Sequence, residues 1–261
     1  PVGLKPRPSA SGSAHWSDLA TAAYKGHITA HPAHFTCSES ALIIVHHLEN
    51  SRSQRVLWLL EELGLPYEVR RYARDPKTML APPELKAIHP LGKSPVIEDD
   101  GAIIAETGAI FEYILQTYAE GRLCAPAGTP EARKLTYWLH YAEGSAMPPL
   151  LLKLVFMRVP EGAPGLLRPL IRQVAEKVQQ QLINPQLASH LAYWESELAR
   201  TGWFVGDGLT AADIMMSFPL EAAASRGGAD KSAAVMDFLN RVHARPAYQR
   251  ALEAGGPYAY A

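Results

Sequence analysis

The chain has 261 residues, of which 48% are hydrophobic and 20% are charged, so it can bury a sizeable core. Its formal net charge of −1 gives no general attraction to nucleic acid or to anionic membranes.

Cys37 and Cys124 are far apart and no CxxC motif occurs, which argues against a disulfide scaffold and a zinc knuckle. Few cysteines fit a reducing cytoplasm. No apolar run reaches the roughly 18 residues that a membrane span needs.

Residues 1–40 differ in character from the rest of the chain. They are rich in Pro, Ser, Ala and His, show little periodicity and contain no long apolar segment typical of a signal peptide. We therefore expect a flexible extension that takes no part in the fold.

Residues 41–120 predict a small α/β domain. The expected elements, in chain order, are a buried strand over 41–48, a helix over 56–63 ended by Gly64, a strand over 67–72, a loop with a short helix, a hairpin around Asp100–Gly101, and a helix over 110–118. This order, βαβ followed by ββα, describes a thioredoxin-like domain.

A linker over residues 119–129 precedes a region without any strand pattern. Apolar residues at helical spacing predict helices over 131–154, 166–182, 186–200, 211–224 and 232–244. The fold class is therefore α/β plus all-α, with an all-helical domain over residues 129–255.

Two motifs in the first domain allow both a structural and a functional interpretation. In "GKSPV", Pro95 is either an ordinary strand-edge proline or follows a cis bond that turns the backbone of Ser94 toward an extended peptide ligand. Glu106 and Thr107 open a helix directly after a strand. They either cap it or bind an α-amino-acid group, the acid taking the ammonium and the helix end taking the carboxylate.

Together with "SRSQR" after the first strand and "WFVGDGLTAADI" late in the chain, these motifs resemble the cytosolic glutathione transferase family. The resemblance runs from Ala41 to about Gly255. It implies an enzyme that joins glutathione to small apolar electrophiles, without a metal, as a cytoplasmic homodimer. Thr210-x-x-Asp213 is a capping-box variant, to which we assign a structural role.

The resemblance also implies roles for individual residues. Ser94, preceding Pro95, would pair its backbone with the cysteinyl part of glutathione. Lys93, helped by His89, would meet the glycyl carboxylate, and Glu106 with Thr107 would hold the γ-glutamyl end. Candidates for the electrophile pocket, which are equally good core residues, are Tyr137, Tyr141, Met147 and Phe156.

A serine at the start of the first helix would donate a hydrogen bond to the glutathione thiolate. Serine-type members place this residue in an S-x-x-x-R pattern, which selects Ser51, four residues before Arg55, over Ser53. Ser51-x-x-Gln54 is also a capping box, and capping leaves the hydroxyl proton free. Whether Ser53 or Asn50 shares the thiolate contact stays open.

Two other functions use the same residues. The first is glutathione-dependent peroxide reduction, in which the same thiolate attacks a hydroperoxide. The second is a transferase-fold module that binds apolar ligands without turnover.

Overall fold

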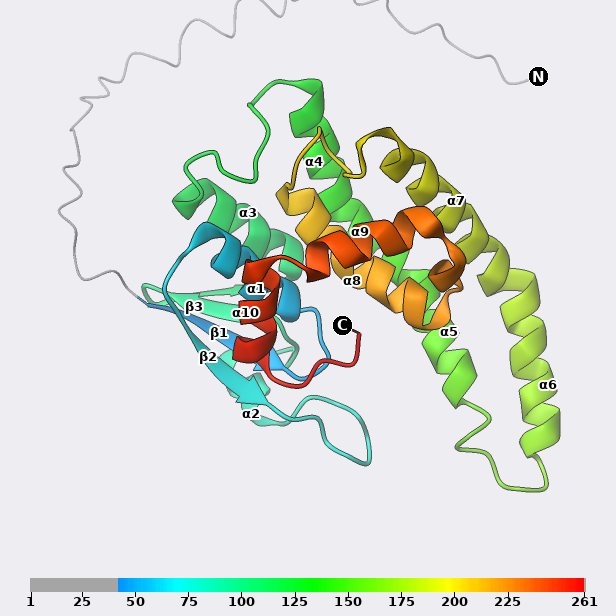
Figure 1. Ribbon diagram of the computed structural model, residues 1–261. Helices are drawn as coiled ribbons and strands as arrows, with labels where there is room; N and C mark the ends of the chain where they lie inside the picture. Colours follow the sequence, from blue (N-terminus) through cyan, green and yellow to red (C-terminus); the bar gives the residue numbers. More distant parts are fainter. Residues whose placement is uncertain (1–41, 261) are drawn as a thin grey trace, which may run out of the picture. The chain divides into compact units, whose positions relative to one another are not determined.

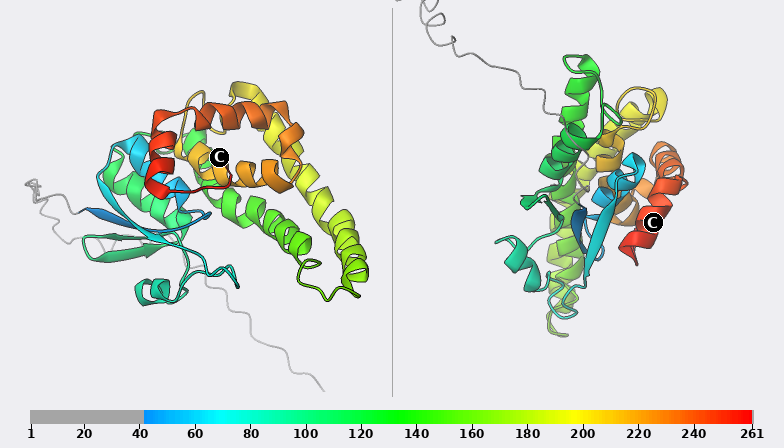
Figure 2. Two further views of the ribbon diagram at one scale, coloured as in Figure 1. Left: turned by 60° about the horizontal axis from the view of Figure 1, so that its bottom comes forward. Right: turned by 90° about the vertical axis from the view of Figure 1, so that its left-hand side faces the viewer.

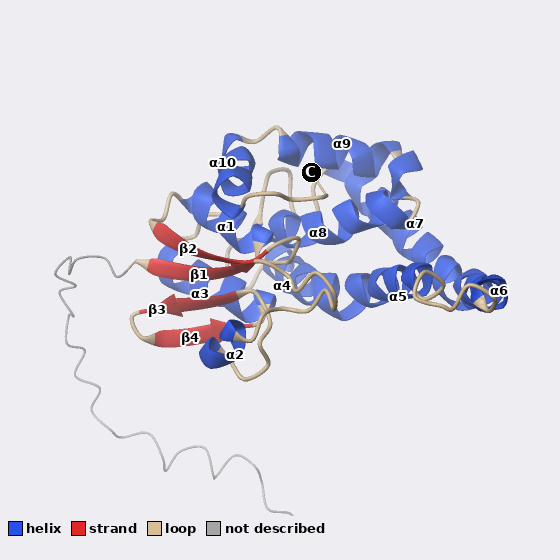
Figure 3. Ribbon diagram, turned by 90° about the horizontal axis from the view of Figure 1, so that it is seen from below, coloured by secondary structure: helices blue, strands red, loops and turns tan. Residues whose placement is uncertain are grey.

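The computed structural model describes residues 42–260, and the extension expected over residues 1–40 lies outside this range. The first described part contains a four-stranded sheet, and helices make up the rest (Figure 1). The strands are β1 (Ile43–Leu48), β2 (Tyr67–Tyr72), β3 (Val96–Asp99) and β4 (Ala102–Ala105). They lie in the order β2-β1-β3-β4 (Figure 3), with β1 parallel to β2 and both other pairs antiparallel.

The helices of this part are α1 (Gln54–Leu63), α2 (Glu84–Ile88) and α3 (Thr107–Tyr118). Gly64 ends α1 in the left-handed conformation, at φ 63°, which a residue with a Cβ adopts only with strain. Every element predicted for residues 41–120 is present, and the thioredoxin-like fold is confirmed.

The remaining described residues contain no strand. Their helical segments are α4 (Pro130–Tyr141), η1 (Ala142–Ala146), α5 (Met147–Arg158), α6 (Arg168–Val178), η2 (Gln179–Ile183), α7 (Asn184–Thr201), α8 (Ala211–Arg226), η3 (Ala229–Lys231), α9 (Ala233–His243) and α10 (Pro246–Gly255). The segments η1 and η2 are π-helical turns inside long helices. Because η2 joins α6 to α7, the expected break between helices at residues 182–186 does not exist. Figure 2 shows α5 and α6 projecting together from the other helices.

Helix α10 was not predicted. It begins with Pro246 directly after Arg245, and proline is common at the first position of a helix because its missing N–H is not needed there. The helix lies beside α1, where the rings of Tyr248 and Trp58 pack edge to face at a centroid distance of 5.2 Å. Arg245 pairs with Glu62, with Nε and Oε1 2.5 Å apart. Among the described residues, the last helix therefore packs against the first.

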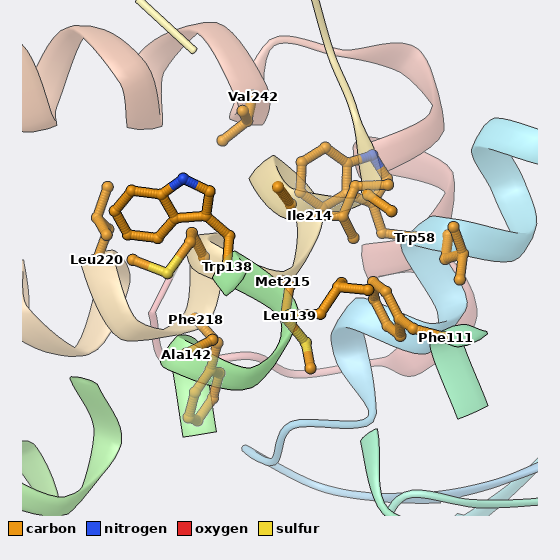
Figure 4. Packing of buried hydrophobic residues seen from close by; sticks show 14 of the residues in the cluster. Trp58, Phe111, Trp138, Leu139, Ala142, Ile214, Met215, Phe218, Leu220 and Val242 are labelled. Carbon is orange, nitrogen blue, oxygen red and sulfur yellow. The ribbon is translucent and has the colours of Figure 1, made fainter. Parts of the chain in front are cut away.

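One hydrophobic core runs through both predicted domains (Figure 4). Trp58 of α1 and Phe111 of α3 belong to the same cluster as Trp138 of α4 and Met215 of α8, and all four are buried. The division into separate domains over residues 41–120 and 129–255 stays a prediction, since the apolar contacts are continuous across it.

The predicted capping box is present at the start of α8. Asp213 is fully buried, and its carboxylate accepts hydrogen bonds from the N–H of Phe204 at 2.8 Å and from the N–H of Thr210 at 2.7 Å. The hydroxyl of Thr210 donates to the same carboxylate at 2.8 Å. Asp213 thus holds the preceding loop against the helix end.

Replacing Asp213 by Ala should lower the free energy of unfolding by about 2–4 kcal/mol, because buried N–H donors lose their acceptor. Chemical denaturation measures this loss. Asp207→Ala changes an exposed carboxylate of the same loop and should leave stability nearly unchanged. Equal stabilities of the two variants would contradict the structural role of Asp213.

Candidate active site

A cavity of about 590 Å³ lies beyond the carboxyl end of β1, beside the loops that lead into α1, β3 and α3. It contains every predicted site residue except Ser53. The members are Ser51, His89, Lys93, Ser94, Pro95, Glu106 and Thr107. Residues that are more than fifty positions apart in sequence thus meet at one edge of the sheet.

The Ser94–Pro95 peptide bond is cis. The Ser94 hydroxyl donates to the carbonyl of His46 at 2.7 Å and accepts from the N–H of Leu48 at 3.2 Å. These bonds fasten the side chain of Ser94 to the end of β1. Because the side chain is used internally, its backbone groups are what this residue can offer to a ligand.

Glu106 is the residue from which α3 starts, and its backbone has φ 71° and ψ 124°. This conformation is rare for residues other than glycine and costs about 1–3 kcal/mol, so the surrounding structure must enforce it. Neither its side chain nor that of Thr107 caps the helix, contrary to the structural interpretation from sequence. The first N–H groups of α3 have no acceptor within the helix and can bind an anion beside the exposed carboxylate of Glu106.

Cationic side chains for which the sequence predicted no role in the site also line the cavity. They are Arg52, Arg74 and Lys86, in addition to the predicted Lys93. Arg74 donates through Nε to the carbonyl of Glu49 at 3.1 Å and through Nη1 to that of Met79 at 3.0 Å. Its place just after β2, at the carboxyl edge of the sheet, was the signal that could have identified it.

Ser51 and Ser53 are both buried, but only Ser51 lines the cavity. Their hydroxyl oxygens are 2.7 Å apart, and the Ser51 oxygen also accepts from the N–H of Ser53 at 3.3 Å. The capping box expected between Ser51 and Gln54 is absent. Helix α1 starts after Ser53, and the buried amide of Gln54 has no hydrogen-bond partner.

Asn50 does not line the cavity either. Its backbone has φ 51°, and its Oδ1 accepts a hydrogen bond from the N–H of Ala259 at 2.7 Å. The side chain therefore joins the segment after α10 to the loop that carries Ser51.

Two family models match the chain. The N-terminal domain of glutathione S-transferase matches residues 40–116, and the C-terminal domain matches residues 168–254. Glutathione S-transferase 1 of Saccharomyces cerevisiae is 39% identical over 193 residues, covering 71% of this chain and 82% of the relative. Glutathione S-transferase 3 of Schizosaccharomyces pombe is 35% identical, covering 70% and 74%.

The chain belongs to the glutathione transferase family.

The crystal structure of a glutathione S-transferase from Actinobacillus pleuropneumoniae agrees with this assignment. It has a TM-score of 0.68 and 32% sequence identity, covering 84% of this chain and 95% of that one. The predictions of the family, of a transferase enzyme and of glutathione as its co-substrate are confirmed.

Two findings concern the described part of this transferase alone. Residues 42–260 contain no cluster of three or more His, Cys, Asp or Glu side chains arranged to hold a metal ion. No helix within this range combines the length and the apolar character that crossing a bilayer requires.

Arg55, whose spacing selected Ser51, is buried at the junction of the sheet-containing and helical parts of the transferase. Its guanidinium donates to the carbonyl of Met215 at 2.7 Å and to the carboxylate of Glu143. Glu143 also accepts from Nε of Arg52 at 2.7 Å. The ring of Phe218 lies beneath both guanidinium groups, 5.6 Å from that of Arg52 and 5.3 Å from that of Arg55.

The four residues proposed for the electrophile pocket do not line the cavity. Tyr141 and Met147 are buried in the core, Phe156 packs against it, and Tyr137 is on the surface. The helical part contributes Glu143 and Leu151 instead. The π turn η1 adds one residue to a helical turn. The residues that follow it therefore lie on a different face of the helix from the one that regular α-helical spacing predicts.

Glu143 makes the stability of the folded protein depend on pH, and its partners Arg55 and Arg52 determine the sign of this dependence. Burial alone would raise the pKa of this carboxyl, but the charges and hydrogen bonds of Arg55 and Arg52 lower it below its usual value of 4.5. A carboxyl whose pKa is lowered in the folded state stabilises the protein above its unfolded pKa. This stabilisation is lost as the pH falls through the folded pKa.

Glu143→Gln should therefore reduce the free energy of unfolding by about 2–3 kcal/mol at neutral pH, and the difference from the wild type should shrink below about pH 4. Denaturation of the wild type and of the variant across this pH range measures the difference in their free energies of unfolding. Glu176→Gln, at an exposed position of α6, serves as the control. A difference that stays constant with pH would refute the ion-pair explanation.

Proposed function

We propose that this glutathione transferase binds glutathione along the edge of the sheet and activates its thiol through the hydroxyl of Ser51. The observation that carries this proposal is that Ser51 lines the same cavity as Ser94, Glu106 and Thr107. A thiol placed in this cavity lies just before α1, where the helix dipole also favours negative charge.

Each part of the tripeptide meets a group of suitable chemistry. Glu106 takes the γ-glutamyl ammonium, and Thr107 with the first N–H groups of α3 takes the adjacent carboxylate. The backbone of Ser94, before Pro95, pairs with the cysteinyl part. Lys93, helped by His89, binds the glycyl carboxylate.

In terms of free energy, the Ser51 hydroxyl at the start of a helix is sufficient to lower the pKa of the glutathione thiol. A free thiol has a pKa of about 8.5, and lowering it by about two units requires about 2.7 kcal/mol of preference for the thiolate. A hydrogen bond to a charged group supplies about 1.5–3 kcal/mol. The start of a helix adds about 0.3–1 kcal/mol. Ser51 thus acts as a hydrogen-bond donor, while the glutathione sulfur is the nucleophile.

The second substrate in this proposal is a small apolar electrophile. Apolar side chains of the cavity wall support it, and they come from both the sheet-containing and the helical part of the chain. They are Leu48, Leu80, Pro83, Leu91 and Leu151. Such surface binds an apolar compound by removing it from water, while the charged groups are taken by glutathione.

Ser51→Ala should lower kcat/KM for a chlorinated nitrobenzene by roughly ten- to a hundredfold, with little change in the KM for glutathione, because the thiolate loses a donor. The ultraviolet absorbance of the bound thiolate, titrated with pH, should show the thiol pKa returning toward that of free glutathione. Ser189→Ala, on the exposed side of α7, is the matched control.

Unchanged kinetics in Ser51→Ala would remove this serine from the mechanism. An unshifted thiol pKa in the wild-type protein would instead support a binding module without turnover.

We further propose that the transferase is a cytoplasmic homodimer, in which the small domain of each subunit meets the helical domain of the other. The single described cysteine, Cys124, is a free thiol, which suits a reducing compartment. Large exposed apolar side chains on α6 support the dimer. Leu170 is 61% and Val174 is 56% exposed, and one helical turn separates them.

Changing both Leu170 and Val174 to Glu should convert the dimer into a monomer, because the charges would have to be buried without partners. Sedimentation velocity measures the change. Arg172→Glu, at a neighbouring exposed position, should leave the dimer intact. A wild-type protein that sediments as a monomer would refute the proposal.

A further inference from the structure

A row of three side chains leads from the cavity wall into the interior beneath it. The hydroxyl oxygen of Ser51 is 2.7 Å from that of Ser53, which is 2.9 Å from Nδ1 of His47 on β1. Ser53 has no exposed surface and His47 is 1% exposed. Only Ser51, the outermost member, reaches the cavity.

The number of protons in this row determines what Ser51 can do. Each hydroxyl has one proton, and one of the two must donate across the 2.7 Å contact between Ser51 and Ser53. If Nδ1 of His47 accepts from Ser53, the Ser53 proton is used, so Ser51 must donate inward and has nothing left for the cavity. If Nδ1 carries a proton and donates to Ser53, Ser53 can donate to Ser51, whose own proton then points outward.

The surroundings of Ser51 and Ser53 favour the second arrangement. The oxygen of Ser51 already accepts the N–H of Ser53 at 3.3 Å, so it is placed as an acceptor toward the interior. The other acceptor near the Ser53 hydroxyl is the carbonyl of Leu48, at the longer distance of 3.5 Å. Donation from Ser53 to Ser51 uses the shorter contact.

We propose that His47, as the tautomer with a proton on Nδ1, acts through Ser53 as a positioning residue that keeps the Ser51 proton directed at the glutathione thiolate. This inference rests on the proposed role of Ser51. Hydrogen bonds in a row polarise one another, so the row also makes Ser51 a stronger donor than an isolated serine. Neither His47 nor Ser53 touches the substrate.

The environment of His47 keeps the imidazole neutral and immobile. Burial, with the charge of Arg71 on β2, lowers its pKa to about 4, so a choice of tautomer exists at neutral pH. The neighbours from the other elements, Gln54 of α1 and Gly255 of α10, are uncharged. A Cβ at Gly255 would lie 3.2 Å from Cε1 of His47 and 2.5 Å from Oε1 of Gln54, so the close approach of α10 encloses the ring.

The tautomer is directly observable. Long-range ¹H–¹⁵N correlation spectra of the full protein with ¹⁵N-labelled histidine separate Nδ1–H from Nε2–H imidazoles, and loss of one signal in His47→Asn assigns it. The expected result is a neutral ring protonated on Nδ1. A ring protonated on Nε2 would overturn the proposal, because Ser51 would then have to donate inward.

Three variants test the functional consequence. Ser53→Ala and His47→Leu should raise the pKa of the bound thiol by about half a unit to one unit. At a pH about three units below the free thiol pKa of about 8.5, which is below the lowered pKa of the bound thiol, kcat/KM should fall by roughly three- to tenfold, with the KM for glutathione unchanged. His47→Asn, whose amide offers an N–H near the position of Nδ1, should stay within about twofold of the wild type.

The outcomes separate this inference from the proposed function. If Ser51→Ala leaves the thiol pKa unchanged, the proposed role of Ser51 fails. If Ser51→Ala raises the thiol pKa while Ser53→Ala does not, the proposed role of Ser51 stands. The proposed positioning by His47 through Ser53 is then overturned. Thermal unfolding identifies variants that fail to fold. Should His47→Leu be one of them, a thiol pKa in His47→Asn equal to that in Ser53→Ala also overturns the proposal.

Discussion

The buried guanidinium of Arg55 is the interaction on which the site depends. It joins α1 to the backbone of α8 at Met215 and to the carboxylate of Glu143 in η1. Breaking a buried ion pair by removing one partner costs roughly 3–5 kcal/mol, so the helical part is fixed relative to the start of α1. Ser51 lies three residues before the start of α1, so the same contact also fixes this serine relative to the helical residues of the cavity wall, Glu143 and Leu151.

Local sequence patterns were sufficient to predict most of the fold. The residues of the first domain alternate or repeat at the spacing of the elements they form, and glycines mark the turns. The site could also be predicted where one motif carries one role, as for Glu106, Thr107 and Lys93, which all line the cavity. Their roles in binding remain proposals, because placement alone does not measure affinity.

The sequence predictions that failed did so for physical reasons that local patterns do not show. A π turn changes the face that a long helix presents, so Glu143 and Leu151 were missed. For Tyr141 the structure favours the core alternative that the sequence left open. The capping box assigned to Ser51 and Gln54 failed because Ser51 has a nearer partner in Ser53. His47 was overlooked because a histidine within an apolar strand gives no local sign of the side chain it will meet.

The segment after α10 connects the end of the described chain to the site. Tyr258 donates a hydrogen bond to the buried carboxylate of Glu221, and Ala259 donates to Asn50, the residue before Ser51. Detachment of this segment would release the loop that carries the hydroxyl. Opening of this segment would therefore be thermodynamically linked to occupancy of the site. If bound glutathione stabilises the closed form, amide hydrogens of the segment after α10 should exchange more slowly when the site is filled.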